Sequence, residues 1–525
     1  MDPRADVTDT APALEAEQEI ANATTGGSVL RGGIWNSASK ILPQFFTLLV
    51  SIAGARILGA SGLGRQSYIA FVATSAIYVL GLGLPLALMR QIGESVGAGL
   101  APQARGLVRW SFRFSVGGAA IGLLGLTAVA LGGAEPQAAW ILAGLIVAAG
   151  VLTQIPDAII SGLQHWRDSS VVVLWSSAVG AAVTVLVLAA GGGVTGMIAV
   201  QFAVALPILV VMAVIGRRRL LAVAPRSEIA PRALRARTLR YSASVFVGTL
   251  VTLVVFRRSE FFFLNHYASD RDIALYSVAF SVMSTLVLVP EALGAVLTPA
   301  VATLLGAGQM DRIRSGYARA LRLVLLGSLP AAALGLALGP ELVTLLFGRG
   351  FRDSEIPLLI LLAPFPLIPL MSASFSLIEG LGKVKFPLVA GVGSAVLNVA
   401  LDFALIPSYS ANGAAAANSI AQGISAVAIL VYGVRLVGGV RWEVNPLARM
   451  AITSAAVGAL AWVAVSAIGG VVGLVAGLAL ATAAFVLLCG LLRVISHDDA
   501  AWLRQAFGSM LGGAIGTAIR RVEVR

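Results

Sequence analysis

The chain has 525 residues, of which 58% are hydrophobic and only 12% are charged, and its net charge is +12 at neutral pH. Soluble domains carry about 25% charged residues, so this composition excludes a string of soluble domains and indicates membrane helices. The 58 glycines fit that class, because small residues let membrane helices approach closely. A single cysteine, Cys489, excludes a disulfide framework, and the three histidines have no ligand spacing, so we expect no metal or other cofactor.

The predicted elements begin after an acidic amino-terminal segment. Residues 1–27 have no basic stretch leading into an apolar core, so we expect a disordered cytoplasmic tail and not a cleaved signal peptide. Runs of about 20 apolar residues, enough to cross a bilayer core, then follow almost end to end. They predict about fourteen membrane spans, near residues 31–58, 66–90, 108–132, 138–161, 170–190, 194–216, 241–264, 273–305, 318–340, 356–379, 385–406, 412–434, 446–468 and 470–494.

A strongly basic segment lies between the sixth and seventh runs. Eight arginines fall within residues 217–240, which predicts a cytoplasmic linker that fixes the topology and touches anionic lipid headgroups. The alternative is a gate contact or a partner-docking site. The linker separates an N-lobe at 28–216 from a C-lobe at 241–435. Two further spans at 446–494 and an amphipathic cytoplasmic tail at 495–525 complete the predicted organisation.

The distribution of basic residues predicts the orientation. With a cytoplasmic amino terminus, 29 of the 37 Lys and Arg fall inside, one falls within a span and seven fall outside. This bias follows the positive-inside rule and predicts that both termini are cytoplasmic. The seven outside residues are Arg56, Arg65, Arg257, Arg258, Arg271, Arg349 and Arg352.

The two halves of the chain carry related motifs. Asn36-Ser-Ala-Ser39 recurs as Tyr241-Ser-Ala-Ser244. Leu84-Pro85 recurs as Val289-Pro290. Because each half has an even number of spans, both enter the membrane in the same direction. We therefore predict an all-α polytopic membrane protein with two six-helix lobes related by a parallel pseudo-two-fold axis around a central cavity, plus two carboxy-terminal helices. This organisation is typical of transporters.

Several stretches resemble a known family. They are Ala55–Tyr68 after the first span, Tyr276–Phe280 at the start of the eighth, Glu379–Pro387, Asn398 and Ser410–Ala417. Each is similar to a motif of the oligosaccharide flippases in the multidrug/oligosaccharidyl-lipid/polysaccharide exporter superfamily. The resemblance covers about residues 30–435. It implies an inverted-V fold around a central cavity, and alternating access that moves a lipid-linked glycan from the cytoplasmic to the outer leaflet.

One feature departs from that family. Its members commonly carry an acidic residue near the end of the seventh span, whereas this chain has Phe256-Arg-Arg-Ser-Glu260, with the acid beside two arginines. We therefore infer the chemistry of the cavity from the residues of this chain and not from the family pattern.

Polar and ionisable groups inside spans are the candidate site residues, because inserting a charge costs about 2.5–3.5 kcal/mol. Asn36, Lys40 and Gln44 are spaced by four residues and share one face of the first span. We expect them to line the cavity and bind the substrate. The alternative is that Lys40 snorkels to the cytoplasmic interface.

Arg257, Arg258 and Glu260 lie near the outer end of the seventh span. The planar guanidinium group suits phosphate, so the two arginines are candidates for binding a diphosphate. A local Arg–Glu arrangement at the membrane interface explains the same residues equally well.

The remaining candidates are acids within or beside spans, each with either a structural or an ion-coupling and gating role. They are Asp157 after Pro156, Glu291 after Pro290, Glu379, Asp402 and the already named Glu260. Asn398 and Asp402 share a helix face and form the best candidate coupling pair.

These observations predict a transporter in the bacterial inner membrane that flips a polyprenyl-diphosphate-linked oligosaccharide or exopolysaccharide precursor. The alternatives are an ion-coupled multidrug exporter of the same superfamily and a lipid II flippase. A membrane glycosyltransferase, polymerase or ligase would need a sizeable outside loop with catalytic groups, and no outside connection exceeds about 16 residues. We expect no enzyme and no nucleic-acid partner. The expected partners are the lipid-linked glycan, membrane lipids, and polymerase or glycosyltransferase machinery.

Overall fold

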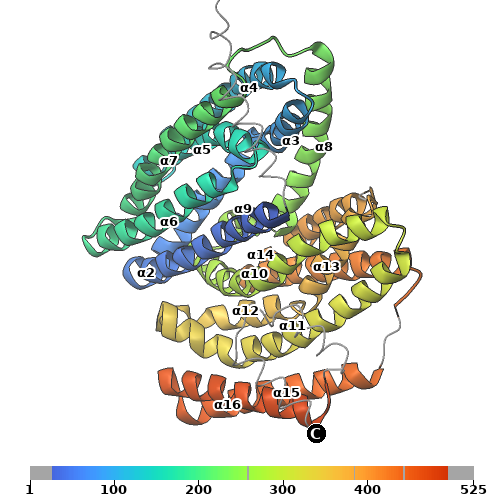
Figure 1. Cartoon of the computed structure of the whole chain (residues 1–525). Helices are drawn as coiled ribbons and strands as arrows, with labels where there is room; N and C mark the ends of the chain where they lie inside the picture. Colours follow the sequence, from blue (N-terminus) through green and yellow to red (C-terminus); the bar gives the residue numbers. More distant parts are fainter. Residues whose placement is uncertain (1–25, 257–258, 384, 441–443, 495–525) are drawn as a thin grey trace, which may run out of the picture. The chain divides into compact units, whose positions relative to one another are not determined.

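The computed structural model describes residues 26–256, 259–383, 385–440 and 444–494. Within these ranges the side chains of 26–41, 255–256, 287–296, 299–300, 302–303 and 444 are not described. Every regular element in the described ranges is a helix (Figure 1). The contacts divide the chain into two compact units, Met1–Phe261 and Phe262–Arg525. We describe each unit by itself.

The first unit contains the helices that precede the boundary. They are α2 (Gly26–Leu80), α3 (Leu84–Gly97), α4 (Ala101–Leu131), α5 (Gln137–Gly162), α6 (Trp166–Ala189), α7 (Gly193–Val223) and α8 (Arg232–Phe256), and α9 (Glu260–Tyr267) crosses the boundary. Helix α5 packs against both α4 and α7, and α2 packs against α6. One apolar core gathers Ile69, Trp140 and Val147, and a second gathers Leu88, Leu107 and Ile159.

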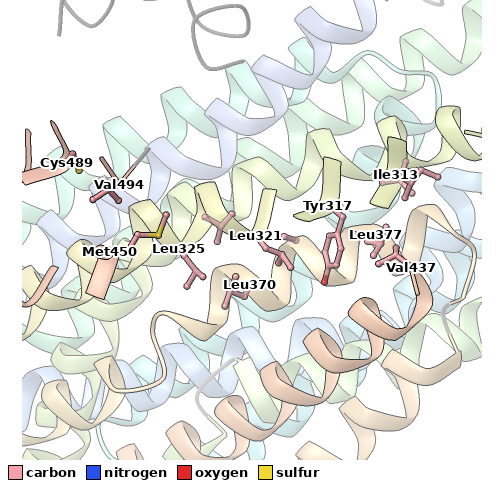
Figure 2. Packing of buried hydrophobic residues seen from close by; sticks show 13 residues of the cluster. Ile313, Tyr317, Leu321, Leu325, Leu370, Leu377, Val437, Met450, Cys489 and Val494 are labelled. Atoms are coloured by element: carbon pink, nitrogen blue, oxygen red, sulfur yellow. The ribbon is translucent and has the colours of Figure 1, made fainter. Parts of the chain in front are cut away.

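The second unit contains the remaining helices. They are α10 (Asp270–Gly306), α11 (Met310–Phe347), the short 3₁₀ helix η1 (Arg349–Ser354), α12 (Glu355–Leu362), α13 (Leu367–Gly380), α14 (Lys385–Leu436), α15 (Val444–Ile468) and α16 (Gly470–Leu491). One apolar core of this unit includes Leu321 and Leu325 of α11, Leu370 and Leu377 of α13, and Cys489 of α16 (Figure 2). The cysteine is therefore a buried core residue.

A buried hydrogen-bond chain crosses this core. The hydroxyl of Tyr317 lies 2.7 Å from Ser374 Oγ, and Ser374 Oγ donates to the carbonyl of Leu370 at 2.7 Å (Figure 2 labels Tyr317 and Leu370). A serine hydroxyl has one proton, so Tyr317 is the donor to Ser374. Gly433 completes the contact, because a Cβ there would lie 2.8 Å from the tyrosine hydroxyl. The hydrogen bonds thus join α11 to α13, and α14 packs against the Tyr317 hydroxyl at Gly433.

Two long helices are each broken once. Without a break, the 52 residues of α14 would extend about 78 Å, more than twice the thickness of a bilayer core. Ser410 interrupts α14 with φ 46° and ψ −124°. Gly59 interrupts α2 with φ 71° and ψ −175°, a conformation that is essentially restricted to glycine. Each of these helices therefore consists of two helical segments joined at the break.

Nine helices in the described ranges are long and apolar enough to cross a membrane. The count is ten if the pair at Arg349–Leu362 and Leu367–Gly380, bent by 42°, forms one span. The prediction of an all-α polytopic membrane protein is confirmed. The number of fourteen spans, the lobe symmetry and the domain boundaries stay predictions. The carboxy-terminal tail at 495–525 and nearly all of the amino-terminal tail lie outside the described residues.

The hairpin of α15 and α16 packs on α11 through small residues and a helix cap. Gly458 meets Ala333 of α11, where an added Cβ would lie 3.0 Å from the alanine Cβ. Glu341 of α11 accepts a hydrogen bond of 2.9 Å from the backbone N–H of Gly470, at the first turn of α16. A carboxylate at this end of a helix satisfies an N–H group and interacts favourably with the helix dipole.

We expect Glu341→Ala to destabilise the protein by about 1 kcal/mol, because the cap is lost. Thermal unfolding of the purified protein in detergent measures this effect. Glu341→Gln is the matched control, because its carbonyl oxygen still accepts the hydrogen bond. Equal unfolding temperatures for Glu341→Ala and the native chain would contradict the capping role.

Candidate functional site

The segment after α7 is attached to α4. Arg105 of α4 donates to the carbonyl of Ala224 at 3.1 Å and to that of Pro225, and Arg109 donates to Ser227 Oγ at 3.3 Å. Gly106 of α4 leaves room for the carbonyl of Glu228, where any side chain would clash. The start of the basic linker therefore follows the surface of the first unit.

Helix α8 continues that attachment onto α3. Thr238 and Ser242 are buried one turn apart on α8, and Ser242 Oγ donates to the carbonyl of Leu82 at 2.6 Å. Gly83 has φ +67°, and a Cβ on it would lie 2.6 Å from the carbonyl oxygen of Ser242 and 2.7 Å from the amide nitrogen of Phe246. Backbone meets backbone at this point, so the place of α8 depends on the missing side chain at Gly83.

Charged residues continue the same contact. The carboxylate of Glu94 on α3 accepts from Arg90 Nε at 2.8 Å and from Arg237 Nη2 of α8 at 2.6 Å. The Arg90 guanidinium lies 4.7 Å from the centre of the Tyr241 ring. Two arginines from two helices thus converge on one carboxylate.

The second unit contains a buried polar stripe within α14. The segments 385–409 and 411–436 lie side by side, because Ser394 Oγ donates to the carbonyl of Ala421 at 2.9 Å and Gly413 lies against the carbonyl of Leu405. Small residues after the break allow this close approach.

Polar side chains from both segments contribute to the stripe. Asn398 and Asp402 are fully buried on the first segment, while Asn418 is fully buried on the second and Gln422 nearly so. Gln422 Nε2 donates to Asn418 Oδ1 at 2.6 Å. All four residues take part in hydrogen-bonding or electrostatic interactions. The buried carboxylate of Asp402 and the buried side-chain amides of the same helix can offer oxygen ligands to a small cation, and the carboxylate can also hold a proton.

The other predicted residues have varied positions. Gln44 is exposed on α2. Lys40 and Asn36 lie on the same helix, but their side chains are outside the described residues, as are Arg257 and Arg258. The cavity role of these residues stays a prediction.

Glu260, by contrast, is fully buried in the first unit, at the start of α9. Ser259 Oγ beside it donates to the carbonyl of Val254 at 2.7 Å, and Phe261 packs edge-to-face on Phe71 of α2 at 5.3 Å. Glu260 thus lies just after the end of α8, next to the residue, Phe261, that packs on the second segment of α2.

None of the other three acids predicted as coupling or gating residues is described as buried. Asp157 is exposed on α5, and Glu379 is exposed on α13 with the Thr298 hydroxyl 3.5 Å away. Glu291 lies in α10, with its side chain outside the description. Of the five acids, Asp402 and Glu260 alone are described as buried.

Sequence reasoning missed Asn418 and Gln422, as well as the cluster of Arg90, Glu94 and Arg237. The spacing of four residues between Asn418 and Gln422, within an Ala-rich segment, was an available signal. No local signal links Glu94 to Arg237, because 143 residues separate them.

Comparison with known proteins assigns the family. A family model described as polysaccharide biosynthesis protein matches residues 29–305, more than half of the chain. The chain belongs to the polysaccharide biosynthesis protein family. A second model, MatE, matches residues 249–404. The resemblance to flippases of the exporter superfamily is thereby confirmed. None of the curated proteins matches this chain.

Solved structures share the fold of this family member. An inward-facing multidrug resistance MATE family transporter of the MOP superfamily is 16% identical, with a TM-score of 0.65 over 77% of this chain and 98% of its own. The lipid II flippase MurJ in an inward closed conformation is 12% identical, with a TM-score of 0.67 over 87% and 98%. A MOP superfamily transporter from Pyrococcus furiosus is 14% identical, with a TM-score of 0.57 over 78% and 95%. At these identities the likeness shows the fold alone.

Proposed function

We propose that this family member flips a polyprenyl-diphosphate-linked oligosaccharide or exopolysaccharide precursor from the inner to the outer leaflet of a bacterial inner membrane. The observation that carries the proposal is the match of the polysaccharide biosynthesis model to residues 29–305. Flipping makes and breaks no bond, so the protein acts as a transporter and not as an enzyme. Both termini and the basic linker lie on the cytoplasmic side, and polymerase or glycosyltransferase machinery supplies or takes up the glycan.

The chemistry of the substrate explains the basic candidates. A diphosphate must cross the bilayer core along a polar path, while its polyprenyl tail stays in lipid. Lys40 with Asn36 and Gln44, and Arg257 with Arg258, supply cationic and hydrogen-bonding groups for that path. Alternating access exposes the path to one side of the membrane at a time.

Transport against a gradient needs an energy source, and we assign the coupling site to Asp402 and Asn398. Both are fully buried on the first segment of α14, and Asn418 is fully buried on its second segment. A cation or proton neutralises the buried carboxylate when it binds, and so favours one of the two conformations. Glu260 is a second buried acid with a gating role, at the end of the seventh span.

The first test is a clean deletion of the gene. We expect surface polysaccharide to disappear and undecaprenyl-diphosphate glycan to accumulate facing the cytoplasm. The native gene should restore export, whereas Lys40→Ala and the double variant Arg257→Ala with Arg258→Ala should lower export on the order of tenfold, since each removes charge from the diphosphate path.

Arg349→Ala is a suitable control, because the sequence predicts this arginine just before a span and not on the diphosphate path. Export that stays intact in all the candidate variants would contradict the proposed path. Unchanged surface glycans in the deletion strain would contradict the function itself.

The second candidate is an ion-coupled multidrug exporter, which the MatE match over residues 249–404 favours. Changed drug susceptibility in the deletion strain, with ion-dependent efflux of cationic dyes and normal glycans, would support it. Lipid II is a related candidate substrate, because the fold is shared with a lipid II flippase. Loss of cell viability on depletion of this protein would point to lipid II.

A further inference from the structure

The cluster of Glu94, Arg90 and Arg237 joins α3 to α8 at an exposed position in the first unit. The side chains of Arg90 and Arg237 are 48% and 61% exposed, and that of Glu94 is 35% exposed. Each arginine contacts a different oxygen of the carboxylate. Glu94 therefore lies between two arginine side chains that are each about half exposed.

The cluster contributes little to the attachment of α8. The backbone contact at Gly83, the hydrogen bond from Ser242 and the burial of Thr238 already place α8 on α3. Exposed ion pairs stabilise proteins by only about 0.2–1 kcal/mol each. Two arginines around one carboxylate also leave a net charge of +1, where a purely structural brace needs only one of them.

The stereochemistry suits an anion that is larger than a carboxylate. Each guanidinium has five N–H donors in a planar fork that fits phosphate, and each donates one hydrogen bond to a single oxygen of the Glu94 carboxylate. Tyr241 lies against the Arg90 guanidinium and orients it. A diphosphate presents more oxygens and more negative charge than Glu94, so it would exchange favourably with that side chain.

We propose that Arg90 and Arg237 form a receiving site for the diphosphate of the lipid-linked substrate, and that Glu94 occupies this site when the substrate is absent. The proposal rests on the proposed function. It adds a phosphate-binding site at the linker side of the first unit, made of residues other than the candidates Lys40, Arg257 and Arg258. Glu94 makes the site selective, because a weakly charged anion does not displace a carboxylate held by two arginines.

The variant Glu94→Gln distinguishes this role from a purely structural one. If the cluster only holds α8, Glu94→Gln weakens it and creates no affinity for phosphate. If Glu94 competes with the substrate for Arg90 and Arg237, the same variant removes the competing charge and tightens phosphate binding.

The test uses the full chain in nanodiscs of phosphatidylcholine, titrated with inorganic pyrophosphate and with farnesyl diphosphate by isothermal calorimetry. We expect Glu94→Gln to bind both probes about tenfold more tightly, because one competing charge is removed, and Arg90→Gln with Arg237→Gln to bind them at least about tenfold more weakly. Asp168→Asn is the matched control, since Asp168 pairs with the single arginine Arg219 at 2.9 Å. It should change neither affinity.

The proposal is overturned if Glu94→Gln binds the probes no more tightly than the native chain while unfolding at the same temperature. It is also overturned if phosphatidylglycerol in the nanodisc abolishes the effect of Glu94→Gln, because the ligand is then the headgroup of bulk lipid. Intact glycan export in a strain that carries the double arginine variant would refute this site alone. The proposed function would stand, because it depends on the deletion strain.

Discussion

Asp402→Asn is expected to abolish ion-driven export while leaving the fold intact. The substitution keeps the shape of the side chain and removes the charge from a fully buried position. A charge-assisted interaction contributes about 1.5–3 kcal/mol, so cation affinity should fall about 10- to 100-fold. Glycan flipping in proteoliposomes, followed as a function of the Na⁺ and proton gradients, measures the loss.

Two further variants sharpen this result. Asn398→Ala removes an amide oxygen that can bind Na⁺ but cannot carry a proton, so it should weaken Na⁺ dependence and leave proton dependence unchanged. Asp353→Asn is the control, because Asp353 is an exposed acid of the same unit paired with Arg271 at 2.6 Å. Full gradient dependence in Asp402→Asn would remove this residue from the coupling mechanism.

Gly83→Ala is expected to displace α8 from α3 and to destabilise the protein by about 2–4 kcal/mol, from the positive φ together with overpacking. The new Cβ would lie 2.6 Å from the backbone of Ser242, and helix backbone cannot yield as a flexible side chain can. Denaturation of the purified protein in detergent, together with the export assay, measures both consequences.

Gly99→Ala separates the two causes. Gly99 has φ +74°, close to that of Gly83, but nothing lies within 4 Å of the position of its Cβ. It should therefore cost only the conformational part, about 1 kcal/mol. If both variants lose equal stability, the close contact between α3 and α8 has no energetic importance.

Much of the fold could be predicted from local composition. Apolar runs of bilayer length indicated a polytopic helical protein, because insertion depends on the hydrophobicity of each segment by itself. The motif stretches indicated the family, which the match to residues 29–305 confirms. The four-residue spacing of Asn398 and Asp402 placed them on one helix face, and both are buried there. By contrast, Asp157 and Glu379 have similar apolar surroundings in sequence and are exposed.

The sequence by itself determined the membrane class, the family and the polar face of α14, since these follow from hydropathy and helical periodicity over a few turns. Only the tertiary structure decided which segments meet. Ser242 contacts Leu82 across 160 residues, Arg237 contacts Glu94 across 143, and Gly470 is capped by Glu341 across 129. Such pairs depend on how helices pack, where the absence of a side chain at Gly83 or Gly106 sets the distance between two backbones. Local patterns carry no information about the partner, so the candidate anion site between α3 and α8 became visible only in three dimensions.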